Sequence, residues 1–218
     1  MTAGLIDSTE MYLRTVLELE EEGIPAIRAR LAERLGLSAP SVSEGVARLE
    51  NDGLVRLAED RTVALSTRGR ELAVHVLRKH RLAECLLVDV LGLEHEHVHE
   101  EACRWEHVIS DRVEQKLMEF LGNPQTSPYG NPIPGSEAAD DYKVLTLADA
   151  TTDNVRIERI SEQLQSDHDL MHGFGPDAIS PGDDVTVHRD DGHVVLERDG
   201  TRVRLDMDQA RLLYVSEI

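Results

Sequence analysis

The stretch "AIRARLAERLGLSAPSVSEGVARLENDG", residues 26–53, decides the fold of the N-terminal part of the chain. Its first ten residues carry apolar and charged side chains at the spacing of a short amphipathic helix. The tripeptide "GLS" then makes a turn, and Ser38 is placed to cap a second helix that has Pro40 in its first turn. Gly53 ends this second helix, so the stretch predicts two helices joined by a tight turn.

Two short β-prone runs follow, at residues 54–58 and 62–66, and the tripeptide "EDR" joins them as a hairpin. A further helix is predicted upstream at residues 5–22, where Gly23 and Pro25 end it. A helix–turn–helix followed by a hairpin is the arrangement of a winged helix. On this pattern alone, another small α+β domain remains open.

The remainder of the chain changes character twice. Two helices are predicted at residues 68–91 and 94–121, and residues 122–135 hold four of the eight prolines and three glycines, which indicates a loop. Short alternating runs separated by Gly and Asp turns then indicate a small β-barrel or sandwich. The chain is therefore predicted to be mainly α with β structure, in segments 1–73 (winged-helix DNA-binding domain), 74–140 (helical domain), 141–149 (linker) and 150–218 (β domain).

The charge balance limits the class of partner. A formal net charge of −19 argues against nonspecific binding to nucleic acid. Residues 26–70, however, hold eight Arg and six Asp or Glu, which makes a mildly basic island suited to DNA if bound cations offset the acidic remainder. Two cysteines, no run of 18 apolar residues and no secretory pattern predict a cytoplasmic protein that does not enter a membrane.

One short run suggests a metal site. In "EACRWEHVIS", residues 101–110, Cys103, Glu106 and His107 have the i, i+3, i+4 spacing that puts side chains on one face of a helix. Thiolate, thioether and imidazole ligands together suit a transition metal and disfavour Mg²⁺ or Ca²⁺. A solvated polar stripe is an equally good interpretation of the spacing. Further candidate ligands are Met11, His80, Glu84, His99, Glu162 and Gln165.

Four runs of the sequence closely resemble one known family. These are residues 7–55, "RKHRLAECLL" at 78–87, "HEEACRWEHVISD" at 99–111 and "SPYGNPIPG" at 127–135. They resemble the diphtheria toxin repressor family, and within it the iron-dependent regulators of actinobacterial type. The resemblance implies a homodimeric, Fe²⁺-activated repressor, not an enzyme, with a helical dimerisation and metal-binding domain and a C-terminal SH3-like β-barrel.

The resemblance also implies two metal sites per subunit and an anion site. The primary metal site would use Met11, Cys103, Glu106 and His107, with the backbone carbonyl of Cys103 and a water held by Leu5. The ancillary metal site would use His80, Glu84, His99, Glu162 and Gln165. The anion would be held by Arg81, Ser127 and Asn131. The softer ligands Met11 and Cys103 favour Fe²⁺, with Co²⁺, Ni²⁺, Mn²⁺ or Zn²⁺ as substitutes; a manganese-responsive regulator of the same family is the alternative.

The recognition helix is expected at residues 39–50. The residues predicted to contact DNA are Ser38, Ala39, Pro40 and Ser43 at the groove and Arg28, Arg30, Arg48 and Arg61 at phosphates. At Glu44 the family often has Gln; a carboxylate only accepts hydrogen bonds, as from cytosine N4, so the base preference at this position is in doubt. A dimer that reads two half-sites implies double-stranded DNA with an inverted-repeat operator. The family resemblance implies that this operator controls iron homeostasis genes.

The sequence argues against two other classes of protein. A metalloenzyme is disfavoured because the sequence has no His-Glu-x-x-His motif, no paired Glu-x-x-His pattern and no glycine-rich phosphate loop. A metal-storage protein without DNA binding is disfavoured by the winged-helix pattern.

Overall fold

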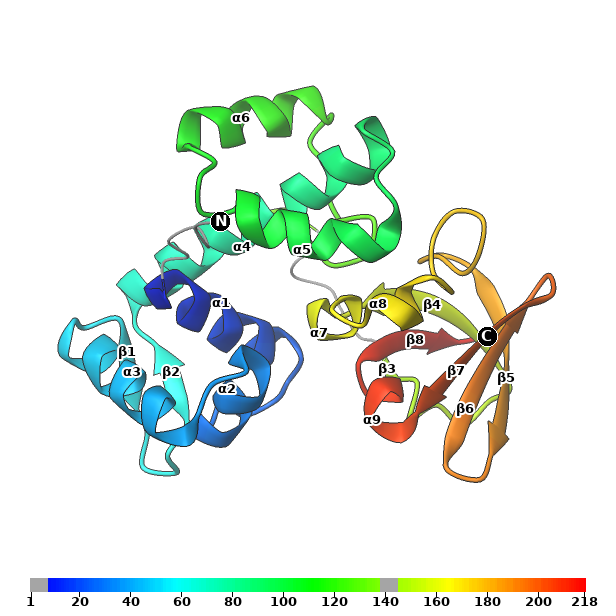
Figure 1. Cartoon of the computed structure of the whole chain (residues 1–218), viewed down its shortest axis with the longest axis horizontal. Coiled ribbons are helices and arrows are strands. Elements are labelled where there is room, and N and C mark those ends of the chain that lie inside the picture. Colours follow the sequence, from blue (N-terminus) through cyan, green and yellow to red (C-terminus); the bar gives the residue numbers. More distant parts are fainter. Residues whose placement is uncertain (1–7, 138–144) are drawn as a thin grey trace. The chain divides into compact units, whose positions relative to one another are not determined.

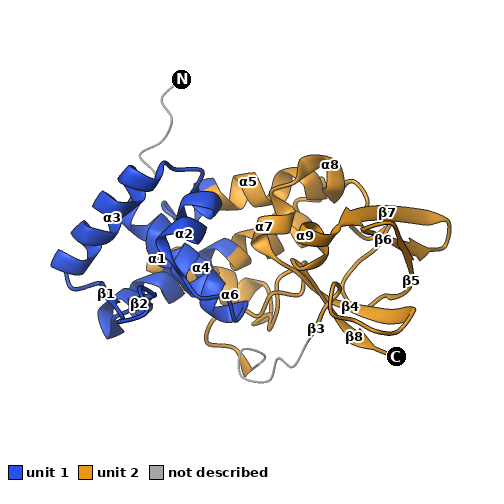
Figure 2. Ribbon diagram, turned by 90° about the horizontal axis from the view of Figure 1, so that it is seen from below, with its two compact units in different colours: residues 1–80, 104–109 blue, residues 81–103, 110–218 orange. Residues whose placement is uncertain are grey.

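The structure is a computed structural model that describes residues 8–137 and 145–218. It forms two compact units, Met1–His80 with Arg104–Ile109 and Arg81–Cys103 with Ser110–Ile218 (Figure 2). The predicted helix residues 5–7, the water-holding Leu5 and the linker residues 141–144 lie outside the described residues.

The first unit has the predicted winged helix-turn-helix (Figure 1). Its elements are α1 (Ser8–Glu21), α2 (Arg28–Leu35), α3 (Ala39–Asn51), β1 (Val55–Leu57) and β2 (Val63–Leu65), with β1 and β2 antiparallel. Gly36 ends α2 in the left-handed conformation at φ 63°, which glycine adopts without steric cost. Ser38 caps α3 by accepting a hydrogen bond from the backbone N–H of Ser41.

A close approach joins α1 to α3 in this unit. Tyr12 of α1 lies directly on Gly45 of α3, where an added Cβ would come within 2.6 Å of the Tyr12 Cζ and Oη atoms. Only glycine leaves room for the ring at this distance. Leu13 of α1 and Val46 and Leu49 of α3 are fully buried in the same hydrophobic core, so α1 packs against α3.

The central helices differ from the prediction. The structure has α4 (Thr67–Cys85) continued by a π-helical turn η1 (Leu86–Val90), then α5 (His95–Trp105) and α6 (Asp111–Phe120). The prediction of one helix over 94–121 was therefore wrong. Ser110 caps the N-terminus of a new helix, α6, by accepting a hydrogen bond from the backbone N–H of Val113. The β-branched residues Val108 and Ile109 directly before it are poor helix formers. Cys103 consequently lies on α5, whereas Glu106 and His107 lie in the turn after it.

The C-terminal part is the expected SH3-like β domain. Its strands are β3 (Leu145–Thr146), β4 (Asn154–Ile160), β5 (Asp184–Asp190), β6 (His193–Arg198), β7 (Thr201–Asp206) and β8 (Leu213–Glu217), and its short helices are α7 (Glu162–Gln165), α8 (His168–Met171) and α9 (Met207–Ala210). The strands form one antiparallel sheet in the order β3-β8-β4-β5-β6-β7, with a register shift in β4 between Ile157 and Arg159. The short strand β3 lies within the range predicted as a linker.

The proline-rich loop after α6 packs within the second unit. Tyr129 and Ile133 are buried, and the backbone N–H of Ile160 at the end of β4 donates to Tyr129 O at 2.9 Å. Gly130 has φ 77°, and a Cβ there would collide with the backbone of Glu158, so this loop lies directly against β4. Of the helices in the described ranges, none is long and apolar enough to cross a membrane.

Candidate metal centre and DNA-binding surface

A buried carboxylate lies at the centre of the first unit. Glu106 is almost completely buried in the turn after α5, and its Oε2 atom accepts hydrogen bonds from Arg14 Nη1 at 2.5 Å and from His80 Nδ1 at 2.7 Å. The two donors converge on one oxygen and are themselves 3.1 Å apart. Arg14, on α1, also pairs with Glu18 at 2.8 Å one helical turn further on. One oxygen of Glu106 is therefore held by two buried side chains.

The other oxygen of Glu106 faces an imidazole nitrogen. Glu106 Oε1 lies 3.2 Å from His107 Nε2, and neither buried atom has a hydrogen-bond partner among the described residues. Two ligand atoms that bind one first-row ion at about 2.1 Å lie about 3.0–3.4 Å apart in octahedral or tetrahedral geometry. A carboxylate oxygen and a ring nitrogen at this separation therefore fit a divalent metal ion.

The second nitrogen of His107 is occupied. Its Nδ1 lies 2.6 Å from the Oε2 atom of Glu10 on α1. Sequence reasoning did not identify Glu10 or Arg14 as part of a site. The available signal was that the charged residues Glu10, Arg14 and Glu18 recur at i, i+4 and i+8 and so share one face of α1.

The two predicted sulfur ligands lie on different elements. Met11 is half-buried on α1 between Glu10 and Arg14, the residues that contact His107 and Glu106. Cys103 Sγ, on α5, lies 3.5 Å from Nε2 of His99 one turn before it.

The other cysteine behaves as a core residue. Cys85 is buried with Leu82 and Ile133, and burial raises the pKa of its thiol, with the nearby Glu84 carboxylate adding to the rise. A thiol held in its neutral form is a poor metal ligand. Cys85 therefore suits a core position and not a metal site.

The residues predicted for the ancillary site are largely buried. Glu162 and Gln165 lie in the single turn of α7, which Ser161 caps through Leu164 N–H at 3.3 Å. Gln165 Nε2 donates to Ile160 O at 2.9 Å, whereas Gln165 Oε1 is buried and accepts no hydrogen bond from the described part of the chain. An amide oxygen left without a donor fits a hard metal ligand. Glu84 and His80 are fully buried, and His99 is half-buried.

The three residues predicted to hold an anion are buried in or near the proline-rich loop. Arg81 is fully buried and donates to Glu162 Oε1 from Nε at 2.8 Å, and to Pro132 O from Nη1 at 2.5 Å. Ser127 accepts from the backbone N–H of Tyr129, and Asn131 Nδ2 donates to Ile160 O at 2.8 Å. In this structure Arg81 pairs with a carboxylate of the protein itself, that of Glu162.

The residues predicted to touch DNA form a solvent-facing surface. All of Ser38, Ala39, Pro40, Ser43, Glu44, Arg30, Arg48 and Arg61 are exposed, and Arg28 is half-buried. Arg48 Nη2 donates to Ser8 Oγ at 3.0 Å, which links α3 to the beginning of α1. Arg61 lies at the tip of the hairpin with φ 69°, and its exposure there suits a phosphate contact by a wing.

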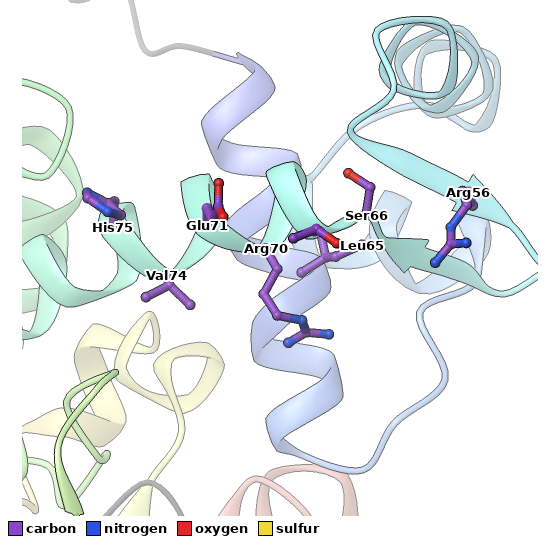
Figure 3. A pocket seen from close by; sticks show the side chains of 8 residues that line it. Arg56, Leu65, Ser66, Arg70, Glu71, Val74 and His75 are labelled. Carbon is purple, nitrogen blue, oxygen red and sulfur yellow. The ribbon is translucent and has the colours of Figure 1, made fainter.

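A cavity of about 390 Å³ with mixed polar and apolar walls opens beside the hairpin (Figure 3). It is lined by Arg56 of β1 and by Arg70, Glu71 and His75 of α4. Arg70 pairs with Glu20 of α1 at 2.5 Å, so the positive charge on this wall is partly neutralised. None of these residues belongs to the predicted metal or DNA-contact sets.

Comparisons with known proteins cover nearly the whole chain. Residues 4–63 match the model described as iron dependent repressor, N-terminal DNA binding domain. Residues 66–135 match iron dependent repressor, metal binding and dimerisation domain, and residues 141–217 match the diphtheria toxin repressor SH3 domain.

Individual relatives agree with these models. The diphtheria toxin repressor of Corynebacterium diphtheriae is 45% identical over 223 residues, covering 98% of this chain and 99% of that protein. The iron-dependent repressor IdeR of Mycobacterium tuberculosis is 49% identical over 199 residues, with 86% of each protein covered. A solved structure of a manganese-dependent transcriptional repressor in complex with manganese has a TM-score of 0.79 at 30% identity and covers 96% of this chain and 100% of its own.

Proposed function

Because the chain belongs to the iron-dependent repressor family, a family of DNA-binding repressors and not of enzymes, we propose that it is a transcriptional repressor activated by Fe²⁺. Its targets in this proposal are genes of iron homeostasis, which it would reach in the cytoplasm. The proposed domains are residues 1–73, 74–140 and 150–218, with residues 141–149 as a linker.

The observation that carries the proposal is the pair of unpartnered atoms Glu106 Oε1 and His107 Nε2, 3.2 Å apart and buried. We propose Met11, Cys103, Glu106 and His107 as the primary site. A divalent ion bound there supplies positive charge and coordination bonds between these groups. Glu106 and His107 contact α1 through Arg14 and Glu10, and α1 packs on α3 through Tyr12 and Gly45. A metal ion that fixes the position of α1 would therefore also affect the position of the recognition helix α3.

A second site in this proposal uses His80, Glu84, His99, Glu162 and Gln165. The unpartnered Gln165 Oε1 supports it. Arg81 holds Glu162 through its Oε1 atom in this structure, so Glu162 would bind the metal through Oε2 while it keeps the contact with Arg81. We propose that Arg81 would also bind an external anion, with Ser127 and Asn131 as its partners.

The choice of Fe²⁺ over Mn²⁺ rests on ligand softness. A thiolate from Cys103 and a thioether from Met11 are softer than the oxygen ligands that suit Mn²⁺. The named relatives at 45–49% identity are iron-dependent or diphtheria toxin repressors, whereas the manganese-dependent structure is 30% identical. Co²⁺, Ni²⁺ and Zn²⁺ are expected to substitute in vitro because affinity for such ligand sets generally rises beyond Fe²⁺ along the series.

The proposed repressor acts as a homodimer. Exposed apolar side chains lie at the end of η1 (Val90), directly after it (Leu91) and on α6 (Val113 and Phe120), with Phe120 at 67% exposure. Exposed apolar groups on these elements suit burial against a second copy. Two recognition helices related by a twofold axis would read an inverted-repeat operator in double-stranded DNA.

The test is a DNA-retardation titration without oxygen. An operator is first selected from a random double-stranded pool with Fe²⁺ present, and binding is then measured with Fe²⁺ and with chelator. Retardation that needs the metal supports the proposal. Metal binding without any retardation supports a storage protein instead, and equal retardation with chelator contradicts activation by metal. Replacing Fe²⁺ by Mn²⁺ at matched free concentration distinguishes the manganese-responsive alternative.

A further inference from the structure

We propose that Glu10 is a positioning residue of the metal centre, which holds His107 in the one tautomer and orientation that make Nε2 a metal ligand. The inference rests on the proposed function, because it concerns how His107 acts within the primary site. Glu10 itself is not proposed as a ligand.

The contact with Glu10 determines which ring nitrogen of His107 carries the proton. A neutral imidazole carries one N–H donor and one lone pair, and the hydrogen bond of one nitrogen decides which is which. His107 Nδ1 lies 2.6 Å from the carboxylate of Glu10, and an ionised carboxylate only accepts hydrogen bonds. The proton therefore belongs on Nδ1, and the lone pair belongs on Nε2.

The lone pair of His107 Nε2 lies next to a carboxylate oxygen of Glu106. His107 Nε2 is buried, has no hydrogen-bond partner among residues 8–137 and 145–218, and lies 3.2 Å from Glu106 Oε1. Without a metal, an acceptor nitrogen beside a carboxylate oxygen is unfavourable, since neither atom donates. A divalent cation between the two atoms would satisfy both of them.

Two residues of α1 hold the two proposed ligands His107 and Glu106. Glu10 holds the far nitrogen of His107, and Arg14 one turn later holds the far oxygen of Glu106. The atoms left over, Nε2 and Oε1, are the pair that lies 3.2 Å apart. A carboxylate behind a metal-binding histidine raises the basicity of the ligand and fixes its ring, and its loss typically costs 10- to 100-fold in metal affinity.

The Glu10 side chain is 31% exposed and His107 only 6%, so the support comes from the solvent side of a buried ligand. This placement makes Glu10 replaceable without opening a cavity in the core. Because the adjacent Met11 is a proposed ligand, the same turn of α1 would supply both a ligand and the support for another.

The test uses the full-length chain, with Co²⁺ as the probe, under anaerobic conditions. The variants are Glu10→Ala, Glu10→Gln and the matched control Glu20→Ala, which removes a carboxylate from the same helix at its ion pair with Arg70. Co²⁺ affinity is measured by competition with a chelator, ligand geometry by the visible absorption bands, and the melting temperature in chelator for each variant.

We expect Glu10→Ala to weaken Co²⁺ binding about 10- to 100-fold and to change the visible bands. Glu10→Gln should lose less, because its amide oxygen still accepts from Nδ1. Glu20→Ala should match the wild type. The inference is overturned if Glu10→Ala keeps the wild-type affinity and spectrum, or if the glutamine variant loses as much as the alanine variant.

The wild type separates this inference from the proposed function. Wild-type protein that binds Co²⁺ but gains no affinity for DNA contradicts the repressor proposal alone, and the Glu10 comparison still decides the inference. Wild-type DNA binding that depends on metal, with an unaffected Glu10→Ala variant, overturns the inference alone.

Discussion

His80 Nδ1 donates to Glu106 Oε2 at 2.7 Å, so one hydrogen bond joins a residue proposed for the ancillary site to a residue proposed for the primary site. Both side chains are fully buried, which keeps this bond strong and shielded from water. In such an arrangement each residue acts as the hydrogen-bonding support of the other. Metal affinity at the two sites should therefore be coupled, and coupling of binding free energies is reciprocal.

The first prediction tests this bond. His80→Ala should weaken metal binding at the Cys103 site by about tenfold, within the usual range for coupled sites, although His80 is not a proposed ligand there. The sulfur-to-cobalt absorption band reports the Cys103 site separately from the other. Glu162→Ala is the control, because this substitution also removes a proposed ancillary ligand. In the wild type, Glu162 accepts a hydrogen bond from Arg81, whereas Glu106 accepts one from His80. Equal losses in the two variants would show that the hydrogen bond carries no coupling.

Arg14 should matter most when metal is absent. Its guanidinium pairs with both Glu18 and Glu106, and Arg14→Leu would leave those two carboxylates buried without it. Breaking a buried pair from one side costs about 3–5 kcal/mol of unfolding free energy. Urea denaturation in chelator measures this loss. Arg70→Leu, which removes a half-exposed ion pair with Glu20, should cost less than about 1 kcal/mol. Similar costs for both would mean that the Arg14 network is not stabilising.

The contact between Tyr12 and Gly45 leads to a third prediction. Gly45→Ala places a methyl group 2.6 Å from the Tyr12 ring, so the ring or α3 must move. Overpacking of this kind typically costs about 1–3 kcal/mol of unfolding free energy. Operator affinity at saturating metal should fall by at least about tenfold, since α3 carries the predicted base contacts. Adding Tyr12→Leu should restore part of the affinity, whereas an unimproved double variant would rule out the clash as the cause.

The N-terminal unit was largely predictable because its signals are local. Ser38 caps α3 as expected, and the helix runs Ala39–Asn51 against a predicted 39–50. The hairpin also forms where the β-prone runs predicted it. Capping, turn formation and strand propensity each depend on a few neighbouring residues, so a single sequence reveals them.

The metal centre was less predictable because its parts come from distant positions. Cys103, Glu106 and His107 have helical spacing, but the helix ends at Trp105, and spacing alone does not show where a serine will cap the next helix. The contacts of Glu10 and Arg14 cross more than ninety residues of sequence. Periodicity shows only that these charges share a face of α1, and tertiary packing decides what the face meets.

The half-buried histidine His95 should make stability depend on pH. Both of its ring nitrogens are buried without hydrogen-bond partners among the described residues, and Tyr129 packs edge-on at 5.4 Å. Burial lowers the pKa of His95, against a smaller opposing effect of Glu96, Asp89 and Glu84. The unfolded chain then binds a proton near pH 6.5 that the folded chain does not, so stability contributed at neutral pH is lost as the pH falls below that value.

The pH prediction is tested by difference, because the chain has ten histidines. Urea unfolding in chelator at pH 7.5 and pH 5.5 should show a smaller loss of unfolding free energy for His95→Leu than for wild type. His193→Leu serves as the control, since His193 begins β6 and its Nδ1 lies 3.2 Å from Asp191 O. An identical pH dependence in wild type and His95→Leu would contradict the assignment.

Glu44 should determine one base of the operator. It is exposed on α3, one turn after Pro40, on the surface predicted to enter the major groove. A carboxylate there accepts a hydrogen bond from cytosine N4 but offers no donor to guanine or thymine. Glu44→Gln adds a donor and should move the preference towards adenine, which pairs with glutamine through N6 and N7. Operators selected by the two proteins from one random pool should differ at one symmetric position, by about 1–3 kcal/mol of binding free energy per contact. Glu50→Gln, an exposed change later on the same helix, provides the charge-matched control. If all three proteins select the same operator and differ only in affinity, Glu44 acts on phosphate repulsion and reads no base.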